Sequence, residues 1–173
     1  MKIIKVKTDS KNYDIKVGHD LLESTPLKKL VSQKDILLII DNKVPGLFIN
    51  KLKNNLKKSS SNKINSININ ASENNKNMSY LAKVYDFLIR NNYSRDCVIF
   101  GIGGGITCDM TGFIASTFLR GVDFVLVPTT LLSQVDASIG GKTGVNHKGF
   151  KNMIGTFNQP AQVIIDTKCL KSL

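Results

Sequence analysis

A run of glycine, hydroxyl and basic residues between positions 101 and 158 holds the residue types that could do chemistry. It opens with the segment GIGGG at 101–105, directly after the apolar residues 97–100 and directly before a predicted helix. Glycines there let a ligand approach the backbone, and a helix start offers free N–H groups and a partial positive charge. The segment therefore predicts a pyrophosphate site. A tight turn without a ligand is the alternative, since Ile106 stands where the common dinucleotide fingerprint has its third glycine.

Hydroxyl and basic side chains follow the glycines along the chain. Thr129 and Thr130 come after an expected strand end, where they could contact a nicotinamide or a phosphate, or simply cap a helix. Lys142 and Lys151 stand in glycine-bearing segments, which favours anion binding. We assign Lys148 to the surface.

Two aspartates are further candidates. Asp41 ends the apolar run 36–40, where an acceptor for a ribose hydroxyl would stand in a nucleotide domain. Its alternative role is the N-cap of a helix over 44–58. Asp109 lies one turn into the helix after the glycines, and its alternative role is a first-turn partner of the helix dipole.

The elements that must position these residues alternate between strands and helices. Short apolar runs such as 36–40 and 97–100 are typical of strands covered on both faces. This order predicts an α/β fold, a Rossmann-like doubly wound and mostly parallel sheet with an N-terminal β-hairpin. Strands are expected over 2–7, 13–17, 36–40, 63–69, 97–100, 124–127 and 163–165, and helices over 20–30, 44–58, 77–91, 105–118 and 131–137. The rest of 128–160 is expected to be a loop rich in Gly, Thr and Asn.

Composition excludes several classes of protein. The net charge of +11 lies mostly in residues 1–90, which hold 17 Lys and Arg against 8 Asp and Glu, and few aromatic residues accompany it. This pattern favours a solvated surface over nucleic-acid binding. No apolar window is long enough to cross a membrane, and the first residues alternate like a strand and not like a signal peptide. Three widely spaced cysteines indicate a reducing cytosol. Two isolated histidines cannot make a three-ligand catalytic metal site without carboxylates or another domain.

The order and spacing of the motifs resemble those of the 3-dehydroquinate synthase family. The glycerol and iron-dependent alcohol dehydrogenases share the glycine loop and the Pro-Thr-Thr, but not the segment 131–142, which makes the match specific. The similar motifs are Gly103–Gly105 with Asp109, Thr111-Gly112-Phe113, Arg120-Gly121, Pro128–Leu132, Val135-Asp136, Gly140–Asn146 and Lys151-Asn152.

The resemblance implies an NAD-binding domain and assigns roles to individual residues. Substrate-facing or catalytic roles fall on Lys142, Asp136, Asn152 and Lys151, with Arg120 reaching the substrate phosphate across a homodimer interface. No residue of the chain is assigned to a metal. Cofactor contacts fall on Asp41, Ala71, Ser72, Glu73, Asn74, Asn75, Lys76, Gly104, Gly105, Ile106, Thr107, Cys108, Asp109, Thr129, Thr130, Leu132, Lys142, Lys151, Cys169, Leu170, Lys171 and Ser172.

The resemblance also implies a reaction of the shikimate pathway, which leads to the aromatic amino acids. A cytoplasmic enzyme with catalytic NAD converts 3-deoxy-arabino-heptulosonate 7-phosphate into 3-dehydroquinate and phosphate. A divalent metal, Zn or Co, is bound in the family by a helical C-terminal domain. We therefore expect residues 1–173 to be the N-terminal NAD-binding domain, without the metal domain and inactive alone. A stand-alone nucleotide-binding module and a sibling sugar-phosphate cyclase are the alternatives.

Overall fold

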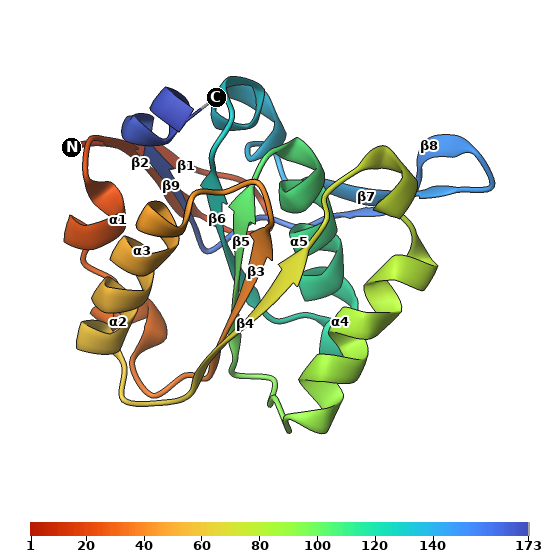
Figure 1. Ribbon diagram of the computed structural model, residues 1–173, viewed down its shortest axis with the longest axis horizontal. Coiled ribbons are helices and arrows are strands. Elements are labelled where there is room, and N and C mark those ends of the chain that lie inside the picture. The colour runs from red at the N-terminus through yellow and green to blue at the C-terminus, as the bar shows by residue number, and fades with distance from the viewer. Residues whose placement is uncertain (173) are drawn as a thin grey trace.

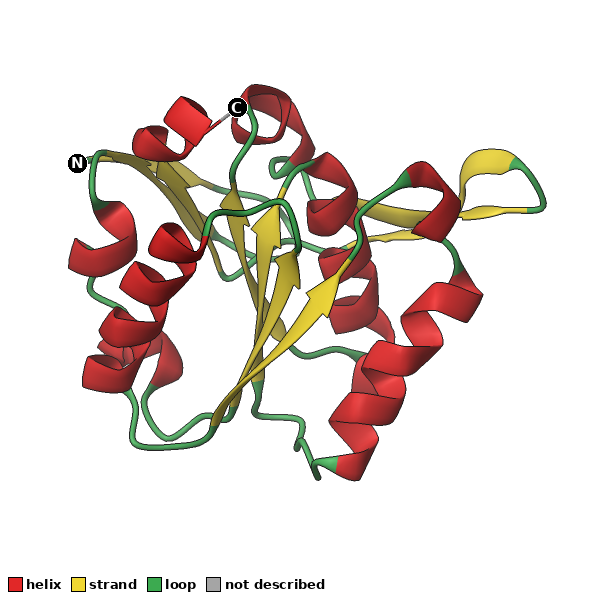
Figure 2. Ribbon diagram, in the orientation of Figure 1, coloured by secondary structure: helices red, strands yellow, loops and turns green. Residues whose placement is uncertain are grey.

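A seven-stranded sheet lies between two layers of helices in the computed structural model, which describes residues 1–172 (Figures 1 and 2). The strand order is β1-β2-β9-β6-β5-β3-β4, and only the β1–β2 pair is antiparallel. This confirms the predicted sheet and its N-terminal hairpin. Its strands are β1 (Lys2–Val6), β2 (Tyr13–Gly18), β3 (Ile36–Asp41), β4 (Ile64–Ile69), β5 (Val98–Gly103), β6 (Asp123–Pro128) and β9 (Gln162–Asp166).

Helices cover both faces of the sheet, with α1, α2 and α3 on one side and α4 and α5 on the other (Figure 1). Leu37 and Ile39 of β3 belong to the core on the α4 and α5 side, whereas Leu38 and Ile40 pack with the α3 side. Burial on both faces explains why this strand is a continuous apolar run. The helices are α1 (Leu21–Ser24), α2 (Lys28–Val31), α3 (Gly46–Ser59), α4 (Met78–Arg90) and α5 (Gly105–Thr117), with short turns η1 (Glu73–Asn75), η2 (Phe118–Arg120), η3 (Ser133–Ala137) and η4 (Thr167–Ser172).

The strand order reverses between β3 and β5. The chain leaves β3 through α3 on one face and leaves β5 through α5 on the other face (Figure 1). Ligands of open α/β sheets bind outside the carboxyl ends of strands at such a reversal, because the two diverging connections leave a crevice there. The fold thus points to the residues that follow β3 and β5.

The helix expected over 20–30 is wrong in its middle. The structure has two short helices, α1 and α2, separated by residues 25–27. Thr25 is extended, with ψ 126°, and it precedes Pro26. The proline ring disfavours the helical conformation of the preceding residue, and this was not weighed in the prediction.

The loop expected over 128–160 is wrong where a second, two-stranded sheet forms. Here β7 (Lys142–His147) pairs antiparallel with β8 (Phe150–Phe157). Lys148 and Gly149 form the turn with φ values of 47° and 84°. A two-residue hairpin turn with both φ values positive favours glycine, so Gly149 was the available signal.

The three cysteines lie in the core. Burial raises the pKa of Cys97 to about 11 and that of Cys169 to about 12, and it also raises that of Cys108. The thiols are therefore protonated at neutral pH.

Within residues 1–172, no helix has both the length and the apolar character needed to span a bilayer.

Candidate active site

Asp41 and Gly103 lie side by side at the carboxyl edge of the sheet. The preceding residues Ile40 and Ile102 are register partners in the β3–β5 pair. A Cβ added to Gly103 would lie 2.9 Å from the Cβ of Asp41. The Asp41 carboxylate accepts a hydrogen bond from the N–H of Lys43 at 3.2 Å, while α3 begins only at Gly46. The N-cap alternative for Asp41 is therefore wrong, and the carboxylate stays at the crevice.

The glycines divide into two pairs with different roles. Gly101 and Gly103 belong to β5, and a Cβ on either would lie 2.8 Å from a threonine Cβ of α5, so they permit α5 to pack on the strand. Gly104 and Gly105 start α5, which has no side-chain cap. The nearest atom to a Cβ on Gly104 would be Cγ2 of Thr130, at 3.3 Å. A Cβ on Gly105 would lie 3.1 Å from that of Ala137, so Gly104 is the glycine that a ligand can approach, next to free N–H groups.

Two predicted contacts in α5 can be made only by backbone atoms. Thr107 and Cys108 are both buried, at 0 and 1% exposed, in the packing of α5.

Thr129 donates its N–H to the carbonyl of Gly103 at 2.9 Å, which ties the ends of β6 and β5 together. The Thr130 hydroxyl lies 2.9 Å from that of Ser133 and accepts from the Ser133 N–H at 3.3 Å, a capping arrangement.

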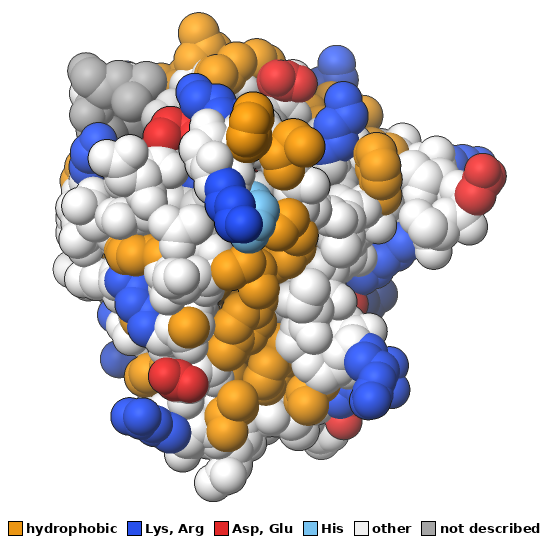
Figure 3. All heavy atoms as spheres, turned by 90° about the vertical axis from the view of Figure 1, so that its right-hand side faces the viewer, with side chains coloured by type: hydrophobic (Ala, Val, Ile, Leu, Met, Phe, Trp, Pro, Cys, Tyr) orange, Lys and Arg blue, Asp and Glu red, His pale blue; other side chains and the backbone are white. Residues whose placement is uncertain are grey.

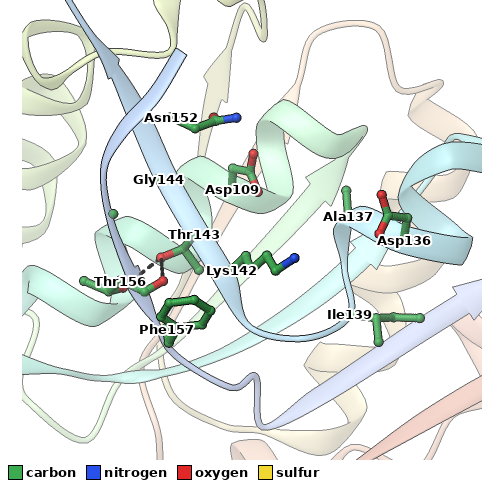
Figure 4. Close-up of a pocket in the computed structure, with 11 residues that line it drawn as sticks. Asp109, Asp136, Ala137, Ile139, Lys142, Thr143, Gly144, Asn152, Thr156 and Phe157 are labelled. Carbon is green, nitrogen blue, oxygen red and sulfur yellow. Dashed lines mark hydrogen bonds between the residues drawn. The ribbon is translucent and has the colours of Figure 1, made fainter. Parts of the chain in front are cut away.

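A pocket of about 520 Å³ opens beside the start of α5. Four predicted site residues line it, and each comes from a different element: Asp109 from α5, Asp136 from η3, Lys142 from β7 and Asn152 from β8 (Figure 4). The Lys142 ammonium group and the Asp136 carboxylate point into the same space (Figure 4). The pocket therefore joins two carboxylates, an ammonium group and an amide around one opening.

Asp109 forms an ion pair inside the fold. Its Oδ2 lies 2.5 Å from Nζ of Lys76, whose side chain is only 4% exposed. Asp109 lies beyond the first turn of α5, so the first-turn dipole role is wrong. Burial raises the pKa of Asp109 above its ordinary value; Lys76 opposes this rise, and Glu73 and Asp136 add to it. Asp109 thus sits where ionisation is disfavoured in spite of its partner.

The β7–β8 hairpin reaches the site by packing on α5. A Cβ on Gly112 would lie 3.2 Å from the Cβ of Thr143, and Thr156 donates to the Ser116 hydroxyl at 2.9 Å. Strand β8 is exposed along its length, and apolar side chains gather on the face that carries the hairpin (Figure 3). The exposed apolar residues of β8 are Phe150, Met153, Ile154 and Phe157.

Sequence reasoning missed most of the hairpin's contribution to the pocket. The additional lining residues are Ala137, Ile139, Thr143, Gly144, Gly155, Thr156 and Phe157. The turn glycine Gly149 was the available signal, because residues 142–147 show no alternation of apolar and polar residues.

The remaining predicted residues lie around the pocket or away from it. Residues 71–76 follow β4 at the carboxyl edge, and Nζ of Lys151 lies 3.9 Å from Oε1 of Glu73. Ile106 is half-buried, whereas Leu132 is exposed. Residues 169–172 form part of η4 after β9, with Cys169 buried; the side chain of Ser172 lies outside the described part of the structure. Arg120 ends η2, at the other end of α5 and toward the opposite edge of the sheet.

Comparison with known proteins places the chain in a family. The family model described as "3-dehydroquinate synthase N-terminal" matches residues 66–173, more than half of the chain. The chain belongs to the 3-dehydroquinate synthase family. It is 42% identical over 171 residues to the 3-dehydroquinate synthase of a Shewanella species, covering 98% of this chain and 47% of that protein. The chain thus spans about half the length of the curated 3-dehydroquinate synthases it matches.

Solved structures share the fold of this family member. One is a 2-deoxy-scyllo-inosose synthase complexed with carbaglucose-6-phosphate, NAD+ and Co2+, which superposes with a TM-score of 0.87 at 24% identity. The match covers 98% of this chain and 47% of the synthase chain. A 2-epi-5-epi-valiolone synthase from Streptomyces hygroscopicus subsp. jinggangensis, with NAD+ and Zn2+ bound, superposes with a TM-score of 0.82 at 30% identity, covering 98% of this chain and 46% of its own.

Proposed function

We propose that this chain is the NAD-binding part of a 3-dehydroquinate synthase, a carbon–oxygen lyase that converts 3-deoxy-arabino-heptulosonate 7-phosphate into 3-dehydroquinate and phosphate. The observation that carries the proposal is the pocket that gathers Asp109, Asp136, Lys142 and Asn152 beside the start of α5. The family supports the reaction, and the NAD+ bound by the valiolone synthase relative supports the cofactor.

The crevice between β3 and β5 fits NAD. Gly104 lies directly before α5 and has no side chain to block it, so the N–H groups at the start of this helix would hold the pyrophosphate. Asp41, at the end of β3, would accept a hydrogen bond from a ribose hydroxyl. Thr129 and Lys151 would line the nicotinamide side. When bound, NAD would supply reversible hydride transfer with a ring carbon of the substrate and would not be consumed.

The pocket side chains would bind and orient the sugar phosphate. The Lys142 ammonium group would neutralise an anionic group as a point charge. The Asp136 carboxylate would accept hydrogen bonds from substrate hydroxyls, and Asn152 would supply an amide. Arg120 lies at the other end of α5 from the pocket of its own subunit. In a homodimer it would therefore reach the phosphate group of the substrate bound in the neighbouring subunit.

The described residues do not fit a catalytic metal, since no cluster of three His, Cys, Asp or Glu occurs among them. We place the metal ligands in the half of the relatives' length that this chain does not span. The purified 173-residue chain is therefore expected to release no phosphate from the substrate. Phosphate release by that chain alone would overturn this assignment.

Nucleotide binding by the glycine turn can be measured by calorimetry. Gly104→Val should weaken NAD binding by roughly tenfold or more, because the side chain would stand where the pyrophosphate must approach. Gly46→Val is the matched control: Gly46 starts α3 and a Cβ there meets nothing within 4 Å. Equal NAD affinity in both variants and the wild type would refute the placement of the pyrophosphate.

A further inference from the structure

Lys76 is a buried charged residue held by two elements other than its own. It is 3% exposed, and its Nζ lies 2.5 Å from Oδ2 of Asp109 in α5 and 2.5 Å from Oδ1 of Asn152 in β8. An ammonium group is costly to bury unless it is paired and hydrogen-bonded. Both partners line the pocket, whereas Lys76 does not. Lys76 therefore stands behind the pocket wall and joins two of its members.

The backbone beside Lys76 is bonded to the same hairpin. The Asn146 N–H donates to the Lys76 carbonyl at 2.7 Å, and Asn77 and Asn146 form an isolated β-bridge. The Asn146 side chain donates to Oε2 of Glu73 at 2.9 Å. The segment 73–77 and the hairpin are thus fixed to each other close to the Lys76 side chain.

Asn152 has a backbone conformation that needs such support. Its φ is 54°, in the left-handed region that favours glycine and that Asn adopts more readily than most other residues. It lies in an irregularity of the hairpin where Asn146 alone faces residues 151–153. The Asn152 N–H donates to Oδ1 of Asn146 at 2.9 Å. The side-chain bond from Lys76 is the second restraint on this residue.

The charge on Lys76 decides which way the Asn152 amide faces. An ammonium group only donates hydrogen bonds, so it must take the amide oxygen. The amide nitrogen, with its two hydrogens, is then left for the pocket. A group bound there must present an oxygen acceptor, such as a hydroxyl, carbonyl or phosphate oxygen.

We propose that Lys76 is a positioning residue that fixes the Asn152 amide so that its nitrogen donates to the substrate. The ion pair with Asp109 holds the ammonium group in place for this purpose. The proposal rests on the proposed function for the identity of the substrate, but the orientation of Asn152 does not depend on it. It adds to the cofactor contact implied by the family resemblance, because two of the three hydrogens of the Lys76 ammonium group are donated to protein atoms.

The restraint that Lys76 places on Asn152 is tested without any ligand in the 173-residue chain. Hydrogen exchange of the Asn152 backbone N–H, followed by NMR, should speed up roughly tenfold in Lys76→Met, because the side-chain restraint is lost. Lys76→Arg, which keeps the charge and donors, should restore slower exchange, and it also serves if Lys76→Met does not fold. Lys63→Met is the control, since Lys63 bonds Asp35 and the Asn91 carbonyl away from the pocket. Exchange in Lys76→Met at the wild-type rate would overturn the proposal. If Lys76→Met does not fold, exchange in Lys76→Arg as fast as that in Asn152→Ala would overturn it instead.

The catalytic consequence is tested in the enzyme expressed from its complete gene. Lys76→Met should raise KM for the sugar phosphate about tenfold, and Asn152→Ala should give a similar loss. The double variant should be no worse than either single variant, because both remove the same contact. Additive losses would show that Lys76 acts elsewhere and would overturn the proposal. If wild type binds neither NAD nor substrate, the proposed function fails, while the exchange experiment still decides whether Lys76 restrains Asn152.

Discussion

Two aspartates with lysine partners lie at opposite edges of the sheet, and they differ in burial. Asp123 begins β6 and bonds Lys11 at 2.8 Å and Lys34 at 3.0 Å, with all three side chains about a third exposed. Asp109, at the pocket edge, has only Lys76 as its ion-pair partner among the described residues, and these side chains are 23 and 4% exposed. The same pairing of residue types therefore occurs in two different dielectric environments.

The two environments drive the carboxyl groups in opposite directions. Burial disfavours ionisation of Asp123, but hydrogen bonds from Lys11 and Lys34 outweigh it and lower its pKa. For Asp109 burial prevails and the pKa is raised. The amino edge thus holds a stabilising surface cluster, and the carboxyl edge holds a charge arrangement that is unfavourable by itself, as is common at functional sites.

Removing each aspartate should separate the two clusters most clearly. Asp109→Ala leaves the buried Lys76 ammonium group without its counter-charge and should lower the free energy of unfolding by about 3 kcal/mol at neutral pH. Asp123→Ala leaves two partly exposed lysines and should cost no more than about 1 kcal/mol. Urea unfolding of both variants measures the difference. Equal losses would show that burial does not distinguish the two edges.

A glycine substitution sharpens the contrast within the carboxyl edge. Gly103→Ala places a methyl group 2.8 Å from the Cβ of Thr107 and 2.9 Å from that of Asp41, so it should destabilise the fold by about 2 kcal/mol. Gly104→Ala meets only Thr130 at 3.3 Å and should change stability by less than about 1 kcal/mol. Thermal unfolding compares them. A larger loss of stability in Gly104→Ala than in Gly103→Ala would show that Gly104, and not Gly103, is the glycine required for packing.

The sequence allowed the sheet and the glycine turn at 101–105 to be predicted because periodicity and glycine content report directly on burial and turns. Asp41 and the segment 101–105 are far apart in the chain, but each follows an apolar run, so both could be assigned to nucleotide binding without the resemblance. The link between Lys76 and Asn152 could not be predicted, because it depends on a hairpin irregularity with a positive φ at Asn152. Local patterns carry no signal for a contact that forms only when two loops meet.

The pH dependence of stability should have opposite signs at the two edges. The folded-state pKa of Asp109 is raised, so the folded state binds its proton more tightly than the unfolded state. Its contribution to stability is therefore largest at low pH and falls as pH rises from the unfolded value near 3.8 through the folded value. The folded-state pKa of Asp123 is lowered, so its contribution is present above 3.8 and is lost as pH falls through the folded value.

Urea unfolding of the two alanine variants across acid pH tests this directly. Relative to wild type, the penalty of Asp109→Ala should shrink as pH rises through its window, whereas that of Asp123→Ala should shrink on acidification. Salt should weaken the second effect more than the first, because the Asp123 cluster is the more exposed and therefore the more screened. If the stability penalties of both variants changed in the same direction with pH, the effect of Lys76 on the pKa of Asp109 would be larger than that of burial. The two clusters would then differ only in degree.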